Sequence, residues 1–223
     1  MPDRLFLFDI DGTLLYTGGA GSKAMEQAFA DLFNISNGFG QISFSGRTDT
    51  AILKDVLRFH SIDSLDSALV RLKELYLQLL PQALPQNQGY LLPGIEELLR
   101  SLQQAPNAIL GLATGNLREG ALLKLRHYGI DGYFRDGGFG DDFEDRSMVV
   151  KVAIERLAPD GEGVIVIGDT PLDIAAGKAN GAYAVAVATG RHSPDDLSAA
   201  GADMVFVDFS AWQNATATLL SLG

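Results

Sequence analysis

The chain has 223 residues, of which 47% are apolar and 20% are charged, a composition typical of a globular protein with room for one α/β domain and a smaller inserted unit. Its 17 Lys and Arg residues against 28 Asp and Glu residues give a net charge of −11, which disfavours binding to nucleic acid or to anionic membranes. The absence of cysteine excludes disulfides, thiolate metal sites and cysteine nucleophiles. The first apolar run is too short for a signal peptide and no run suits a membrane helix, so we expect a cytoplasmic protein.

The first predicted element is a short buried strand at residues 5–8 (LFLF), and two aspartates follow it. Because side chains two residues apart share one face of a strand, Asp9 and Asp11 point the same way where the strand ends. Like charges this close repel each other unless a cation lies between them, so the pair indicates a metal site or acid–base chemistry. Oxygen ligands in a chain without cysteine favour Mg²⁺ over zinc.

The region from residue 22 to about residue 81 has the apolar periodicity of helices. Before it, three glycines at residues 18–21 are expected to act as a hinge. After it, residues 80–89 contain two prolines and a glycine, which break the periodicity and predict a return linker. A helical insertion directly after the first strand is therefore expected.

The rest of the chain alternates predicted strands and helices, which indicates a parallel sheet with right-handed crossovers. The strands are predicted at residues 108–113, 133–139 (a weak one), 164–168, 182–188 and 204–207, and the helices at residues 117–128, 147–157, 172–180, 194–199 and 211–220. In open sheets of this kind, ligands bind beyond the C-terminal ends of the strands. The polar motifs that follow these strands are therefore candidates for one site.

The run at residues 9–14 (DIDGTL) resembles the signature of the haloacid dehalogenase superfamily, in its phosphatase branch. The resemblance implies an α/β fold with a Rossmann-like parallel core at residues 1–16 and 90–223. It also implies a helical cap domain at residues 17–89, as in phosphoglycolate phosphatase and β-phosphoglucomutase. In that family the first aspartate forms an aspartyl-phosphate and the second is the general acid and base, which gives these roles to Asp9 and Asp11. The dehalogenase branch lacks the second aspartate, so Asp11 favours phosphoryl chemistry.

A second motif follows the predicted strand at residues 108–113. Thr114, Gly115 and Asn116 lead into a helix, where a hydroxyl and free backbone N–H groups can bind an anion. Thr114 resembles the Ser or Thr with which the family holds the phosphoryl oxygens, and Gly115 and Asn116 are expected to bind substrate beside it. The alternative is that Thr114 or Asn116 only caps the helix.

Two further aspartates follow the predicted strand at residues 164–168. Asp169 and Asp173 resemble the family's fourth motif, which implies that Asp169 binds Mg²⁺ directly beside Asp9, with the backbone carbonyl of Asp11 as another ligand. Asp173 is expected to act on the metal through a water molecule. Alternatively, Asp173 only complements the dipole of its helix.

The third motif of the family, a lysine before the helix that precedes the fourth-motif strand, is irregular in this chain. Arg146 lies just before the predicted helix and can supply the cation that offsets the acids and the phosphoryl group, and Lys151 is the alternative one turn later. Either could instead be a surface charge. In the cap, Arg47 lies on a glycine-containing loop, where it is either a contact to the substrate's non-reacting end or a solvated side chain.

These residues predict a Mg²⁺-dependent phosphatase that acts on a small phosphorylated metabolite such as phosphoglycolate or a sugar phosphate. Neither nucleic acid nor a membrane is an expected partner, and the protein is expected to be a monomer or a homodimer. One alternative is a phosphomutase of the β-phosphoglucomutase type, which returns the phosphoryl group to a sugar. The other is a non-enzymatic module of the receiver type, which is phosphorylated on an aspartate.

Overall fold

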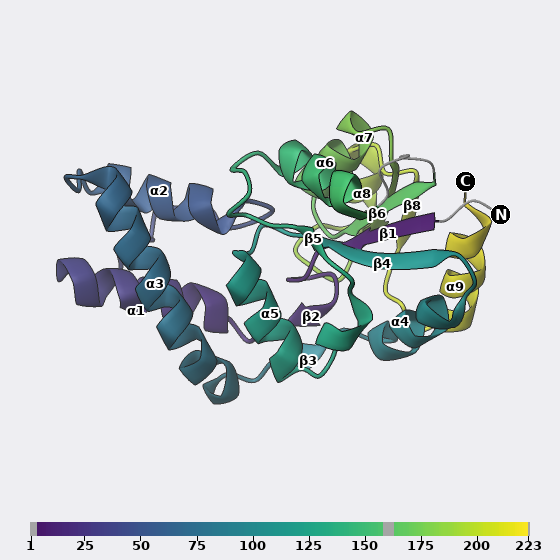
Figure 1. Cartoon of the computed structure of the whole chain (residues 1–223), viewed down its shortest axis with the longest axis horizontal. Helices are drawn as coiled ribbons and strands as arrows, with labels where there is room; N and C mark the ends of the chain where they lie inside the picture. Colours follow the sequence, from purple (N-terminus) through teal and green to yellow (C-terminus); the bar gives the residue numbers. More distant parts are fainter. Residues whose placement is uncertain (1–3, 158–162, 223) are drawn as a thin grey trace.

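A computed structural model describes residues 4–157 and 163–222 of the chain (Figure 1). The outermost residues of the predicted core, 1–3 and 223, lie outside the described part. A six-stranded sheet forms the larger part of the fold, in the order β5-β4-β1-β6-β7-β8, and every neighbouring pair of its strands is parallel. Its strands are β1 (Arg4–Phe8), β4 (Ala108–Ala113), β5 (Gly137–Gly138), β6 (Val164–Gly168), β7 (Tyr183–Val187) and β8 (Met204–Phe206). The predicted parallel α/β fold is confirmed.

The central strand β1 is buried on both faces because it alternates between two hydrophobic cores. Phe6 and Phe8 face one core, and Leu5 and Leu7 face the other. The first face is covered by α4 (Ile95–Gln104), α5 (Arg118–His127) and α9 (Trp212–Ser221). The second face is covered by α6 (Arg146–Leu157), α7 (Pro171–Ala179) and α8 (Pro194–Ala199). A continuous apolar run such as LFLF is thus what a strand covered by helices on both sides requires.

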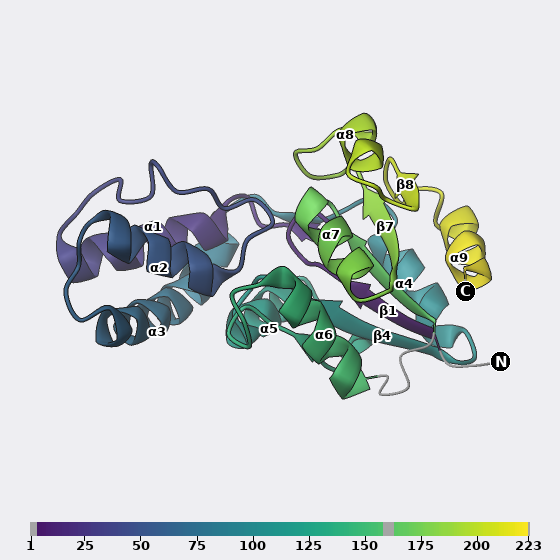
Figure 2. The same cartoon turned by 90° about the horizontal axis from the view of Figure 1, so that it is seen from above.

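Three helices between β1 and β3 form a separate hydrophobic cluster beside the sheet (Figures 1 and 2). They are α1 (Ala20–Phe33), α2 (Asp49–Phe59) and α3 (Leu65–Ala83), and a 3₁₀ turn (Leu84–Gln86) follows them. Their apolar faces pack on one another, so the predicted helical character of this region is confirmed. The division into a cap at residues 17–89 and a core stays a prediction.

The segment that leads from these helices back to the sheet is more regular than the linker predicted at residues 80–89. Helix α3 continues through Pro81 to Ala83. Proline removes only its own backbone hydrogen bond, and burial of the adjacent Leu80 in the helical cluster stabilises this last turn. Two short strands that the sequence pattern does not predict, β2 (Leu15–Tyr16) and β3 (Tyr90–Leu91), then pair antiparallel. They hold the outgoing and returning segments side by side.

The weak strand predicted at residues 133–139 shortens to the two glycines of β5. A 3₁₀ turn (Asp131–Tyr133) occupies the start of that range. At Gly138 the chain passes so close to α6 that a Cβ atom would lie 1.9 Å from the carbonyl oxygen of Val149. Sequence periodicity misjudged this segment because glycine has no side chain to mark a face.

We expect Gly138→Ala to lower the free energy of unfolding by about 1–3 kcal/mol, because a helix backbone cannot yield to the added methyl group without repacking. The matched control is Gly132→Ala, where no atom lies within 4 Å of the added carbon, and a change of no more than about 0.5 kcal/mol is expected. Urea unfolding of both variants measures the difference. Equal stabilities would contradict the close packing of β5 on α6.

Over residues 4–157 and 163–222, none of the helices combines the length and the apolar character needed to cross a membrane.

Candidate active site

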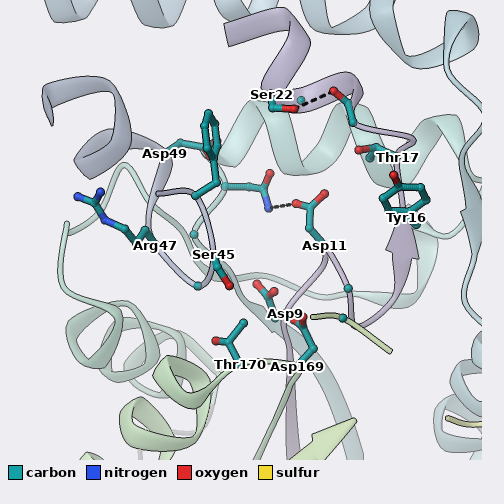
Figure 3. Close-up of a pocket in the computed structure, with 18 of the residues that line it drawn as sticks. Asp9, Asp11, Tyr16, Thr17, Ser22, Ser45, Arg47, Asp49, Asp169 and Thr170 are labelled. Atoms are coloured by element: carbon teal, nitrogen blue, oxygen red, sulfur yellow. Dashed lines mark hydrogen bonds between the residues drawn. The ribbon is translucent and has the colours of Figure 1, made fainter. Parts of the chain in front are cut away.

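Three adjacent strands of the sheet end at one cavity. Asp9 follows β1, Thr114 follows β4 and Asp169 follows β6, and β1 lies between the other two strands. Asp9 and Asp169 line a cavity of about 610 Å³, and residues of α1, α2 and α3 line its opposite side. Figure 3 shows Asp9, Asp11, Asp49 and Asp169 around this space. The site therefore lies where open parallel sheets bind their ligands.

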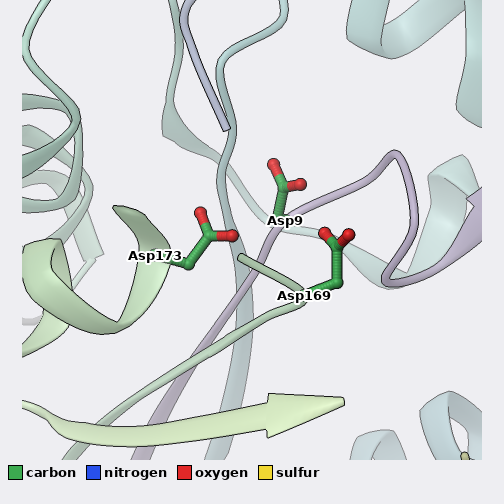
Figure 4. A group of neighbouring side chains, drawn as sticks. All are labelled: Asp9, Asp169 and Asp173. Atoms are coloured by element: carbon green, nitrogen blue, oxygen red, sulfur yellow. The ribbon is translucent and has the colours of Figure 1, made fainter. Parts of the chain in front are cut away.

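Three carboxylates meet where β1 and β6 end (Figure 4), and two of them, those of Asp9 and Asp169, line the cavity. Oxygen atoms of Asp9, Asp169 and Asp173 all lie within 4.8 Å of one another. Burial raises the pKa of Asp9 to about 6, although Arg146 acts in the opposite direction. Burial, with the charges of Asp173 and Asp9, raises the pKa of Asp169 to about 8. The group therefore holds more negative charge than its buried surroundings favour, and a divalent cation would relieve this.

Two glycines shape the space around Asp169. A Cβ atom at Gly190 would lie 1.8 Å from one carboxylate oxygen of Asp169, and one at Gly12 would lie 2.4 Å from the same oxygen. The hydroxyl of Thr13 donates a hydrogen bond to the other oxygen at 3.3 Å. The backbone thus approaches this carboxylate closely on two sides, which fixes its position beside Asp9. All-oxygen donors in such a fixed arrangement fit a small, hard ion.

Both oxygens of the Asp173 carboxylate accept hydrogen bonds. Asp173 is the third residue of α7, where one oxygen accepts hydrogen bonds from the backbone and hydroxyl of Thr170 in a capping box. The other oxygen accepts a hydrogen bond from Arg146. Asp173 is therefore built to orient Arg146 and the start of α7, and an action on a metal through water suits it better than direct coordination.

Arg146, and not Lys151, lies at the acids. Its Nη2 atom donates to Asp9 and to the carbonyl oxygen of Ala113, each at 3.2 Å, as well as to Asp173. Although burial alone would lower the pKa of Arg146, the two carboxylates raise it, so the guanidinium stays charged. Lys151 is exposed on α6 and is absent from the described lining of the cavity, so the structure brings Arg146, and not Lys151, to the predicted site. It lies more than one turn beyond Arg146, and α6 begins at Arg146 itself.

The second motif lies against Asp9 and Asp11. The buried hydroxyl of Thr114 hydrogen-bonds to Asp9 and lowers its pKa, and the side-chain amide of Asn116 donates to Asp11 at 2.8 Å. Gly115 approaches the helical insertion, where a Cβ atom would lie 2.2 Å from the carbonyl oxygen of Arg47. None of the three caps α5 through a side-chain hydrogen bond, and its N-cap is Leu117. The capping alternative does not hold for the helix that follows.

Arg47 lines the cavity, but its charged end is occupied elsewhere. Its guanidinium forms an ion pair with Asp55 at 2.5 Å and donates to the carbonyl oxygen of Ser43. In Figure 3 the guanidinium points away from Asp9 and Asp11. In this arrangement Arg47 contributes its backbone and stem to the cavity, and the predicted contact to the substrate stays a prediction.

Two charged residues of the site were missed by sequence reasoning. Lys124 on α5 is only 5% exposed and donates to Asp11 at 2.6 Å. Asp49, the first residue of α2, accepts a hydrogen bond from the backbone of Leu117, and burial raises its pKa to about 6. A signal for Lys124 was present, because it shares the buried stripe of α5 with Ala121. For Asp49 there was none, since its partner is 68 residues away.

Comparison with known proteins identifies the family to which the chain belongs. A model of the haloacid dehalogenase-like hydrolases matches residues 4–181. The curated relative "Probable phosphatase IndB" of Dickeya dadantii (strain 3937) is 27% identical over 237 residues, which span 98% of this chain and 95% of that protein.

Solved structures show the same fold over almost the whole chain. A hydrolase from Pseudomonas syringae superposes with a TM-score of 0.74 at 24% identity, covering 97% of this chain and 98% of the other. A predicted phosphatase from Clostridium acetobutylicum superposes with a TM-score of 0.72 at 21% identity over 100% of both chains. The family match covers most of the sequence and includes the DIDGTL motif. The chain belongs to the haloacid dehalogenase-like hydrolases.

Proposed function

We propose that the protein is a Mg²⁺-dependent phosphatase that hydrolyses a small phosphomonoester through an aspartyl-phosphate on Asp9. The observation that carries the proposal is the position of the Asp9 carboxylate, which lies between Arg146 and Asp169 at the floor of the cavity. The phosphatase name of the curated relative supports it. A cavity of about 610 Å³ has room for phosphoglycolate, a sugar phosphate or a metabolite of similar size.

The carboxylates suit the metal that this function needs. Asp9 and Asp169 would be the direct ligands, with the backbone carbonyl of Asp11 as the family motif predicts, and Asp173 would act through a water molecule. Carboxylate oxygens are the donors that Mg²⁺ prefers. When bound, Mg²⁺ supplies positive charge that offsets these carboxylates and the phosphoryl oxygens.

In the first step an oxygen of Asp9 attacks phosphorus in line with the leaving oxygen, and the bond from phosphorus to the leaving group breaks. Arg146 has a buried guanidinium held 3.2 Å from Asp9, so its charge is in place for the phosphoryl oxygens. The Thr114 hydroxyl hydrogen-bonds to Asp9 in the free enzyme and can turn to a phosphoryl oxygen. These contacts orient the phosphoryl group for attack.

Asp11 handles the protons of both steps. It donates a proton to the leaving oxygen, so that a neutral alcohol departs. A water molecule then attacks the aspartyl-phosphate at phosphorus while Asp11 takes the proton of that water. The bond between Asp9 and phosphorus breaks, which releases inorganic phosphate and restores both aspartates.

We expect phosphate release to require Mg²⁺, because the acids at the floor of the cavity repel an anionic substrate without it. EDTA should lower the rate by at least about 10²-fold and added Mg²⁺ should restore it. The measurement is phosphate release from phosphoglycolate, sugar phosphates, nucleoside monophosphates and p-nitrophenyl phosphate, each with Mg²⁺ and with EDTA.

Full activity after removal of divalent ions would contradict the metal dependence. An isomerised sugar phosphate without phosphate release would instead identify a phosphomutase. A folded protein that leaves every compound intact would contradict the phosphatase proposal for this panel of substrates.

A further inference from the structure

A buried lysine contacts Asp11 from a helix outside the family motifs that the sequence displays. Lys124 lies on the face of α5 that packs against the rest of the protein, and its side chain is 5% exposed. Its ammonium group donates to Oδ2 of Asp11 at 2.6 Å and to the side-chain carbonyl of Asn116 at 2.5 Å. A lysine is seldom buried unless its charge is paired, so its position beside Asp11 calls for a reason.

The three side chains form a closed set of hydrogen bonds. The amide nitrogen of Asn116 donates at 2.8 Å to the same Oδ2 atom of Asp11 that Lys124 contacts. Among the described residues, none donates a hydrogen bond to Oδ1 of Asp11. Figure 3 shows one oxygen of Asp11 bonded to the amide, with the other directed away from it. One oxygen of Asp11 is thus fixed by two donors, and the other faces the open cavity.

The space for the ammonium group is built by the elements around it. At Gly21 on α1, a Cβ atom would lie 3.4 Å from the Nζ atom of Lys124, so the glycine lets the helical insertion approach this charge. Asp49 of α2 faces the same group and is the second acid near it. Lys124 therefore lies where the sheet, α5 and the helical insertion meet.

We propose that Lys124 is a positioning residue, which holds Asp11 so that its Oδ1 atom faces the leaving oxygen of the substrate. This role rests on the proposed function, in which Asp11 transfers protons. The side chain of Asp11 is 42% exposed on a short turn, so little else holds it in place. The hydrogen bonds from Lys124 and Asn116 therefore restrict its carboxylate to one orientation. A flexible proton donor spends less time in reach of the leaving oxygen, which lowers the rate of the step that needs the proton.

The test compares substrates that differ in their need for a proton. Alkyl phosphates need one at the leaving oxygen, whereas p-nitrophenolate leaves without one. We expect Lys124→Met to lower kcat/KM for the best alkyl phosphate of the panel by at least about 30-fold, and for p-nitrophenyl phosphate by less than about threefold. The change for the alkyl phosphate should lie in kcat with KM nearly constant. In the Asp11→Asn background the same substitution should add almost nothing.

Two further variants separate this role from a structural one. Arg126→Met removes an exposed cation from the same helix and should leave both rates unchanged. Lys124→Gln keeps a donor on a shorter stem, and its loss on the alkyl phosphate should lie between those of the wild type and Lys124→Met. Thermal unfolding of each variant shows whether it is folded under the assay conditions.

The results that would overturn the role of Lys124 differ from those that would overturn the proposed function. Equal losses on both substrates, a rise in KM alone, or additive losses with Asp11→Asn would overturn the positioning role and leave the phosphatase proposal intact. A wild-type protein that releases phosphate from no compound of the panel would contradict the proposed function, and the role of Lys124 with it.

Discussion

Asp9→Asn is expected to lower kcat/KM for phosphate release by at least about 10⁴-fold, because the amide cannot attack phosphorus to form the aspartyl-phosphate. The carboxylate lies at the end of the central strand, between the charge of Arg146 and the carboxylate of Asp169. An amide at this place keeps the size of the side chain but loses its charge, its nucleophilicity and a carboxylate ligand for the metal. The loss should therefore fall on chemistry while the fold persists.

The measurement is phosphate release in saturating Mg²⁺, together with acid quenching of the wild type during turnover to trap phosphate on the protein. Labelled phosphate should stay with the wild type and be absent from Asp9→Asn. The matched control is Asp195→Asn, which changes an exposed aspartate in the first turn of α8 and should leave the rate unchanged. Activity of Asp9→Asn within tenfold of the wild type would contradict a nucleophilic role for Asp9.

The elements that sequence predicted best are those with a strong and local pattern. The strand at residues 164–168 was predicted with the bounds that β6 has, because a β-branched run between helical segments leaves few alternatives. Helix α7 was predicted to within one residue, since Thr170 and Pro171 form a helix start that the local sequence specifies. The alternation of predicted strands and helices along the chain was sufficient to predict a parallel sheet.

The sequence could not predict contacts that depend on how the helical insertion lies against the sheet. Asp49 accepts a hydrogen bond from Leu117, and the loop before α2 contacts Gly115. Neither partner is marked by composition, because hydrogen bonds to backbone atoms can be made by any residue type. The choice between Arg146 and Lys151 was open for a related reason, since it depended on where α6 begins relative to Asp9.

Lys124 could be predicted from the sequence in part. Its place on the buried stripe of α5 was visible in the sequence, and an amphipathic helix with a lysine on that stripe predicts a paired charge. Its partner Asp11 is 113 residues away in the chain, so only the packing of α5 against the strand ends identifies the pair. Sequence could therefore show that the lysine was unusual and could not say what it binds.

Asp169→Asn is expected to have opposite effects on activity and on stability. Loss of a direct metal ligand should lower Mg²⁺-dependent phosphate release by at least about 10²-fold. In EDTA, however, the variant should be more stable than the wild type by about 1–2 kcal/mol near pH 8, because the substitution removes a crowded buried charge. Urea unfolding of both proteins in EDTA at pH 5 and pH 8 measures this gain.

The pH dependence follows from the direction of the pKa shift. Burial and the neighbouring acids raise the pKa of Asp169 in the folded protein to about 8, above the 3.8 of an ordinary aspartate. Between these values the folded state binds more protons than the unfolded state, so this group lowers the stability of the metal-free wild type as the pH rises. The advantage of Asp169→Asn should therefore be small at pH 5 and larger at pH 8, and saturating Mg²⁺ should remove it by stabilising the wild type.

The matched control, Asp203→Asn, is expected to lower stability, whereas Asp169→Asn is expected to raise it. Asp203 is paired with Lys178 and accepts a hydrogen bond from the backbone of Ala184, and these contacts lower its pKa against the effect of burial. Asp203→Asn should therefore lose stability by the same amount at pH 5 and pH 8, since this carboxylate is charged at both. If Asp169→Asn behaved in EDTA as Asp203→Asn does, the acids at the strand ends would not be strained by their proximity, and their need for a cation would lose its physical basis.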